Sequence, residues 1–212
     1  MLLRRNARNR LFRWLPLLAF GMHALVVQSQ ITNVTVGITP ACPYGLAACW
    51  GGAREALGNL DGVKAVLGNP DGTNCTACLQ LSTSSLPDPD QWREQFSSGV
   101  GEAYVFRGVE VTILGSVEEK QGHLLLSAPG SSQTVRLVPL RDLLQWDFRN
   151  QRARKAADDE RKACKRLAAQ LKACKMKTLE MRLTGPLKTT AQGPVLEVRE
   201  FVLLPAAATH SE

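Results

Sequence analysis

The sequence predicts an α+β protein in which a ferredoxin-like β-α-β-β-α-β unit precedes a small OB-like β-barrel with an inserted long helix. Three observations lead to this prediction. Alternating and helical hydrophobic patterns follow one another in β-α-β-β-α-β order between residues 31 and 117. Three successive strand patterns lie between residues 109 and 138, and two more follow residue 177. Between them, residues 140–175 contain neither glycine nor proline and favour a long helix.

The first 29 residues have the composition of a secretory signal peptide. Residues 1–14 carry five arginines and no acidic residue, and an apolar run of 13 residues follows at 15–27. That run is shorter than the ~20 residues that span a bilayer. Cleavage near Ser29 is expected, and an uncleaved membrane anchor is the alternative. We therefore expect a periplasmic or secreted protein.

Removal of this segment changes the charge of the chain. Lys+Arg falls from 26 to 21 against 19 acidic residues, so the formal net charge falls from +7 to +2. A nearly neutral mature chain argues against nucleic-acid binding. The remaining charge is uneven, at −4 for residues 31–105 and +6 for residues 139–175. The basic helix 140–175 is therefore expected to be a solvated face, and a surface for a protein partner is the alternative.

The first unit is expected to span residues 30–108. Residues 31–38 alternate apolar and polar side chains, which is typical of a strand. A cysteine-bearing loop then leads into a helix at residues 50–60. The other predicted elements are strands at 63–67 and 76–81, a turn at 69–72, a helix at 91–98 and a long strand at 103–117.

The second unit is expected to span residues 109–205. Its predicted strands surround the helix at 140–175 and lie at residues 109–117, 123–127, 134–138, 178–184 and 195–204. The first of these strands is expected to end one unit and begin the next. Residues 206–212 are expected to form a disordered tail.

Four cysteines of the first unit, Cys42, Cys49, Cys75 and Cys78, form the candidate site. A thiolate at a helix N-terminus is favoured by the unpaired N–H groups there. In a β-α-β-β-α-β unit the first loop, the turn at 69–72 and the last loop lie at one end of the sheet. We therefore expect the four sulfur atoms to converge there, with Glu102 and Tyr104 of the last loop nearby. Such a group would suit a soft ion, Cu(I) or Zn(II).

The residues around Cys49 also match a known pattern. Gly37-Ile38-Thr39 precedes the cysteines, and the residues in register after Cys49 are Leu57, Leu60, Gly62 and Val63. Residues 31–113 thereby resemble the heavy-metal-associated (HMA) domain of copper chaperones and metal-transporting ATPases. That family carries Gly-Met-Thr-Cys-x-x-Cys and a Leu-x-Gly-Val helix ending, and the resemblance implies a ferredoxin-like fold and metal binding. Two departures are that six residues separate Cys42 from Cys49 and that Ile38 replaces the methionine.

Three interpretations of Cys42 and Cys49 remain open, namely a metal site, a structural disulfide and a redox-active pair. An oxidising compartment favours the disulfide, and the Cys-x-x-Cys spacing of thioredoxin-like pairs is missing between them. Cys75 and Cys78 have the spacing of a metal knuckle, although they would lie ~10 Å apart along a regular strand. Cys164 and Cys174 are expected to be packing thiols on one helix stripe.

No Ser-His-Asp set, paired acids or glycine-rich phosphate loop stands in a context that predicts catalysis. The chain is therefore expected not to be an enzyme. The sequence predicts an exported, non-catalytic, soft-metal-binding protein. The alternatives are a disulfide-stapled structural or adaptor module that has lost metal binding, and a thiol-disulfide redox protein.

Overall fold

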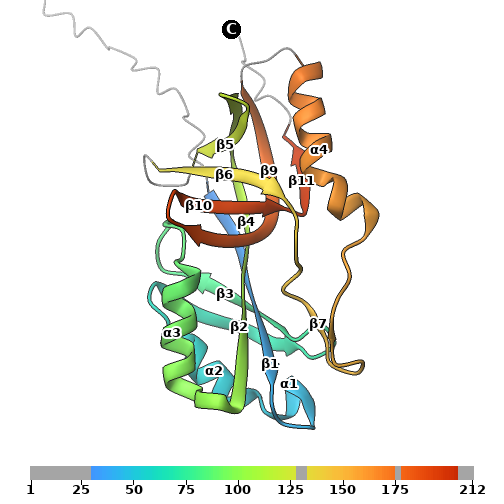
Figure 1. Cartoon of the computed structure of the whole chain (residues 1–212). Helices are drawn as coiled ribbons and strands as arrows, with labels where there is room; N and C mark the ends of the chain where they lie inside the picture. Colours follow the sequence, from blue (N-terminus) through green and yellow to red (C-terminus); the bar gives the residue numbers. More distant parts are fainter. Residues whose placement is uncertain (1–29, 128–132, 175–177, 205–212) are drawn as a thin grey trace, which may run out of the picture.

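The computed structural model describes residues 30–127, 133–174 and 178–204 (Figure 1). These residues form one nine-stranded sheet in the order β11-β9-β10-β6-β5-β4-β1-β3-β2. The expected signal peptide at 1–29 and the expected tail at 206–212 lie outside the described residues. Among the helices of the described part of the chain, none is long and apolar enough to cross a membrane.

The first half of the chain forms the lower part of the molecule in Figure 1. Its elements are β1 (Gln30–Pro40), α1 (Gly45–Ala48), α2 (Trp50–Gly58), β2 (Val63–Asp71), β3 (Thr76–Leu81), α3 (Pro89–Val100), a 3-10 turn (Gly101–Ala103) and β4 (Tyr104–Lys120). The strands predicted at 31–38 and 76–81 and the helix predicted from residue 50 are confirmed.

Local chemistry explains where α3 begins and which face it buries. The Asp88 carboxylate accepts hydrogen bonds from the backbone N–H groups of Asp90 and Gln91, and Pro89 occupies the first helical turn. Trp92 and Phe96, one turn apart, are both buried. They share the core with the inward-facing residues of β1, which are Val34, Val36 and Ile38.

The second half of the chain builds a closed five-stranded barrel from β4, β5, β6, β10 and β9, in which β9 pairs back onto β4. β6 and β10 run parallel and the other barrel pairs run antiparallel. The new elements are β5 (His123–Ser127), β6 (Thr134–Pro139), β7 (Trp146–Asp147), β8 (Arg152–Ala153), α4 (Asp158–Ala173), β9 (Thr178–Thr190), β10 (Gly193–Val198) and β11 (Glu200–Leu203).

The predicted α+β class is wrong. The fold is mostly strand, with 49% strand, four helices and a closed five-stranded barrel, and the described residues do not form a ferredoxin-like domain of their own. The physical reason lies in β4, which has 17 residues. Its residues 104–114 pair with β1, and its residues 109–118 pair with β9. The boundary expected between residues 108 and 109 therefore falls inside a strand that belongs to both halves of one sheet.

The helix predicted at residues 140–175 is also shorter than expected. α4 covers only Asp158–Ala173, and residues 140–157 form an irregular connection that contains β7 and β8. We call this connection the strap. Its backbone N–H groups find partners outside a helix, because those of Arg141 and Asp142 donate to Glu197 and that of Trp146 donates to the carbonyl of Asn74. Tertiary contacts therefore override the helical propensity of these residues.

Candidate functional site

Cys42 and Cys49 form a disulfide, with an S–S distance of 2.03 Å and a Cα–Cα distance of 6.8 Å. The bond closes residues 42–49, which we call the tip loop, and the loop contains α1. It lies at the lower end of the molecule, away from the barrel (Figure 1). Of the three interpretations of this pair, the structure has the disulfide. Neither sulfur is a thiolate in this form of the protein.

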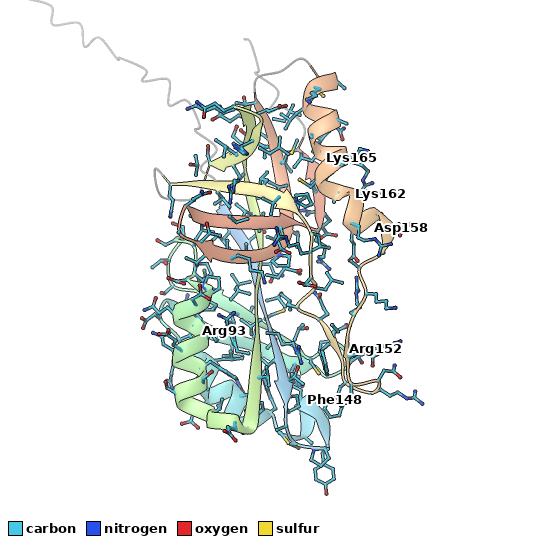
Figure 2. All side chains as sticks on the ribbon, viewed as in Figure 1. Arg93, Phe148, Arg152, Asp158, Lys162 and Lys165 are labelled. Carbon is cyan, nitrogen blue, oxygen red and sulfur yellow. A yellow bond between two sulfur atoms is a disulfide. The ribbon has the colours of Figure 1, made fainter. Side chains whose placement is uncertain are left out.

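The tip loop is held from two further sides. The Tyr104 hydroxyl at the start of β4 donates a hydrogen bond to the carbonyl of Cys49. Gly45, with φ of 84°, lies against the ring of Phe148, where an added Cβ would be only 3.3 Å from the ring. Phe148 belongs to the strap, and Figure 2 shows its label beside the lower end of the molecule. The expected proximity of Tyr104 to Cys49 is therefore confirmed.

The outer surface of the tip loop is uncharged and carries one large exposed aromatic ring. Residues 41–52 contain no charged side chain. Tyr44 has 81% of its surface exposed, although Leu46, two positions later, is fully buried. The exposed neighbours are small residues, namely Pro43, Ala47 and Ala48. The loop thus presents an aromatic side chain from a covalently closed and internally anchored backbone.

Cys75 lies near the base of the tip but does not join the disulfide. The Asp71 carboxylate accepts hydrogen bonds from the backbone N–H groups of Thr73 and Asn74 at 2.9 and 3.0 Å, which folds the turn before β3. Although burial raises the pKa of Asp71, the hydrogen bond from the Asn74 side chain, together with these two backbone hydrogen bonds, outweighs it and lowers the pKa. Cys75 then adopts a φ of 52° and is fully buried as a free thiol. Burial raises the pKa of this thiol, which makes it a poor nucleophile.

Cys78 points away from the other three cysteines of the predicted group. It is exposed, whereas its neighbours Ala77 and Leu79 on β3 are buried, so it lies on the opposite face of the strand. Its sulfur is 4.0 Å from the hydroxyl of Thr35 on β1. Among the described residues, no group of three or more His, Cys, Asp or Glu side chains is placed to hold a metal ion. The structure brings together only Cys42 and Cys49.

The two remaining cysteines differ from each other. Cys164 is buried on α4, as expected of a packing thiol. Cys174 is exposed and caps the end of α4, so the expectation that it packs on the same stripe is wrong. The helix ends one residue before it, and this turns its side chain away from the core.

The strap fastens the barrel to the lower part of the molecule. The Arg107 guanidinium on β4 stacks 3.6 Å from the Trp146 ring and donates from its Nε to the Thr39 hydroxyl at 2.6 Å. The backbone of Leu144 lies so close to Gly37 that an added Cβ there would be 2.7 Å from its carbonyl oxygen. Partial burial lowers the pKa of Arg107. The contact between Gly37 and the strap was not predicted from the sequence. The uncharged stretch around Gly37 is the one sequence feature that could have indicated it.

A charged network joins the strap to α4 and the barrel. Arg199 pairs with Glu110 on β4 at 3.1 Å and with Glu160 on α4 at 3.7 Å, and Arg154 of the strap pairs with Glu160 at 2.5 Å. Burial raises the pKa of Glu110, outweighing the opposing effect of Arg199. Its Oε2 atom has no hydrogen-bond partner among the described residues. The network has a structural character, because the side chains of Glu110, Glu160 and Arg199 are all largely buried.

Comparison with known proteins gives no relative from which to transfer a role. No family model matches the chain, and no curated protein matches it. The fold and the site therefore define the class by themselves: a β-rich protein with a closed barrel and a disulfide-braced, uncharged tip.

Proposed function

We propose that this protein is a non-catalytic adaptor that works outside the cytoplasm and docks a protein partner on its tip loop. The observation that supports the proposal is the exposed Tyr44 on a loop closed by the Cys42–Cys49 disulfide. Export would supply the oxidising conditions under which such a disulfide persists.

Exposed tyrosines are frequent anchors in protein interfaces, because the ring buries a large apolar area and the hydroxyl adds one directed hydrogen bond. Binding normally costs conformational entropy when a loop becomes ordered. Here the disulfide, the Tyr104 hydrogen bond and the Phe148 ring order the loop before any partner arrives. A partner with an apolar pocket and a hydrogen-bond acceptor at its base would fit Tyr44.

Soft-metal binding is less well supported by this geometry. A Cu(I) or Zn(II) site at Cys42 and Cys49 requires both thiolates, and these two sulfur atoms are bonded to each other. The adaptor proposal therefore expects the purified protein, with its disulfide intact, to bind neither ion more tightly than micromolar. Stoichiometric, tighter binding in a titration of that oxidised protein would favour the metal function instead.

Site-specific photo-crosslinking tests the adaptor function directly. A photoreactive phenylalanine replaces Tyr44 in the full chain, expressed in the cells that naturally produce the protein. The matched control carries the same group at Val202, which is 45% exposed and belongs to β11 in the upper half of the molecule (Figure 1). We expect a discrete crosslinked protein from position 44 that is missing from position 202.

Two outcomes would count against the proposal. One is no crosslinked protein from position 44, and the other is the same set of products from both positions. A third variant keeps the photoreactive group at 44 and replaces both Cys42 and Cys49 with serine. Its crosslinking should weaken, because the loop is then no longer closed by the disulfide.

A further inference from the structure

We infer that a hollow on the outside of the barrel, between β6, β9 and β10, binds a small molecule that carries at least two anionic groups. The hollow has a volume of about 560 Å³, within the range of ~300–1,000 Å³ typical of small-molecule sites. We call it the barrel hollow. It lies on a different part of the molecule from the tip loop, and the inference does not depend on the adaptor function.

Three cationic side chains reach the barrel hollow from three different elements. Arg136 comes from β6, Arg141 from the start of the strap and Lys188 from β9. Within the described parts of the chain, none of the three makes an ion pair, and the only side-chain hydrogen bond among them runs from Arg136 to the neutral amide oxygen of Gln192 at 3.0 Å. Their charges are therefore left uncompensated by these residues.

The acidic residues of the hollow do not cancel this arrangement. Glu197 is buried, and its Oε2 accepts from the backbone N–H groups of Arg141 and Asp142 at 3.0 and 3.4 Å. Its carboxylate thus fixes the start of the strap, which carries Arg141. Asp142 is exposed and forms no ion pair with the cations. The barrel strands make the site rigid before any ligand binds.

The lining determines the chemical class of the ligand. Arginine guanidinium groups bind carboxylate and phosphate oxygens through two parallel hydrogen bonds, and lysine adds a point charge. A ligand with two or three anionic groups can pair with Arg136, Arg141 and Lys188 at the same time, whereas a ligand with one anionic group cannot. Val138 and Val195 supply apolar surface between them, which suits the carbon body of such a molecule. Small di- and tricarboxylates and short phosphate chains share this chemistry.

Isothermal titration of the full-length protein with pyrophosphate and, separately, with citrate tests the inference at constant ionic strength. We expect saturable one-to-one binding of at least one of these probes. Arg141→Gln and Lys188→Gln should each weaken it about tenfold, as expected for the loss of one charged hydrogen-bond partner. Arg182→Gln, which removes an exposed cation of β9 outside the hollow, is the matched control and should leave the affinity unchanged.

The two probes also distinguish the sources of the anion. Binding of pyrophosphate alone points to a phosphorylated ligand, and binding of citrate alone points to a polycarboxylate. Either result supports the site. The inference is overturned if neither probe binds saturably at millimolar concentration. It is also overturned if Arg182→Gln weakens binding as much as the hollow variants do. Arg141 and Lys188 are both exposed, so their replacement is not expected to unfold the protein. Unchanged melting temperatures will show that each variant is folded.

Discussion

At the scale of single residues, Gly185 on β9 packs directly against the backbone carbonyl oxygen of Glu197 on β10. A Cβ added to Gly185 would lie 1.8 Å from that oxygen. The obstacle is backbone, so no side-chain rotation can relieve it. This position therefore requires glycine because of close packing. The φ angle of Gly185 does not itself require glycine.

Gly185→Ala is expected to destabilise the protein by at least about 3 kcal/mol, because two barrel strands must move apart to admit the methyl group. The control is Gly51→Ala in α2, where an added Cβ meets nothing within 4 Å. That substitution should stabilise the protein by about 0.5–1 kcal/mol, since alanine favours the helix. Urea unfolding measures both values, and equal effects of the two substitutions would contradict the packing argument.

Glu110 predicts a specific dependence of stability on pH. Burial raises its pKa in the folded protein above the ordinary value of 4.5, so the folded state binds the proton more tightly than the unfolded chain does. The free energy of unfolding should therefore fall as the pH rises from the ordinary pKa through the raised one. Arg199, Glu160 and Glu200 are the charged groups that surround it.

Comparison with Glu110→Gln isolates this effect. The difference in unfolding free energy, wild type minus variant, should decrease across that pH window and become flat above it, because only the wild type loses the proton there. Urea unfolding at a series of pH values gives the difference. A difference that increases with pH would mean that Arg199 dominates and that the pKa of Glu110 is lowered.

At the scale of elements, the strap lies against the turn that carries the buried thiol of Cys75. Trp146 donates its backbone N–H to Asn74, next to Cys75, and its ring stacks on Arg107. Trp146→Ala should loosen this contact and raise the labelling rate of Cys75 by a thiol reagent about tenfold, through easier local opening. The measurement uses a Cys78→Ser, Cys174→Ser background, which removes the exposed free thiols.

Cys164 provides the internal control for this experiment. It is buried on α4 and does not lie on the turn that Trp146 contacts, so it should label slowly in both proteins. Mass spectrometry distinguishes the two sites. If Cys164 labelling accelerates as much as that of Cys75, the variant has lost global stability, and the strap has no specific role in covering Cys75.

The tip disulfide should stabilise the fold by a modest amount, because its two cysteines are only seven positions apart. Loop-closure entropy for so short a loop corresponds to about 2 kcal/mol. The double variant Cys42→Ser, Cys49→Ser should lose this amount in urea unfolding. Wild type under a reductant should behave like the double variant, whereas Cys78→Ser with Cys174→Ser should behave like untreated wild type. Stability unaffected by reductant would argue that the bond does not brace the loop.

At the scale of the whole molecule, local patterns were enough to place most elements. The Asp88-Pro89-Asp90 start of α3 rests on short-range hydrogen bonds that the sequence displays directly. The turn predicted at residues 69–72 is displaced, because β2 extends to Asp71 and the turn before β3 occupies residues 72–75. The fold class could not be predicted in this way. It depends on β4 pairing with both β1 and β9, and a run of alternating residues does not say how many partners its two edges have.

The candidate site was predictable only in part. The sequence marks Cys42 and Cys49 as a pair, but the choice between disulfide and metal depends on distances between atoms. The strap could not be anticipated either, because its residues favour a helix and are held in an irregular conformation by distant partners. The exposed Tyr44 does carry a signal, namely an aromatic residue in an uncharged stretch between two cysteines.

The most direct test of the docking role of the tip is the affinity of the protein crosslinked through position 44, measured against purified variants. Tyr44→Ala should weaken binding by at least about tenfold, because the anchoring ring is lost. Val202→Ala, which removes an exposed side chain of β11, outside the tip loop, should leave the affinity unchanged. Equal affinities of wild type and Tyr44→Ala would contradict the account, because the tip loop would then contribute nothing to recognition.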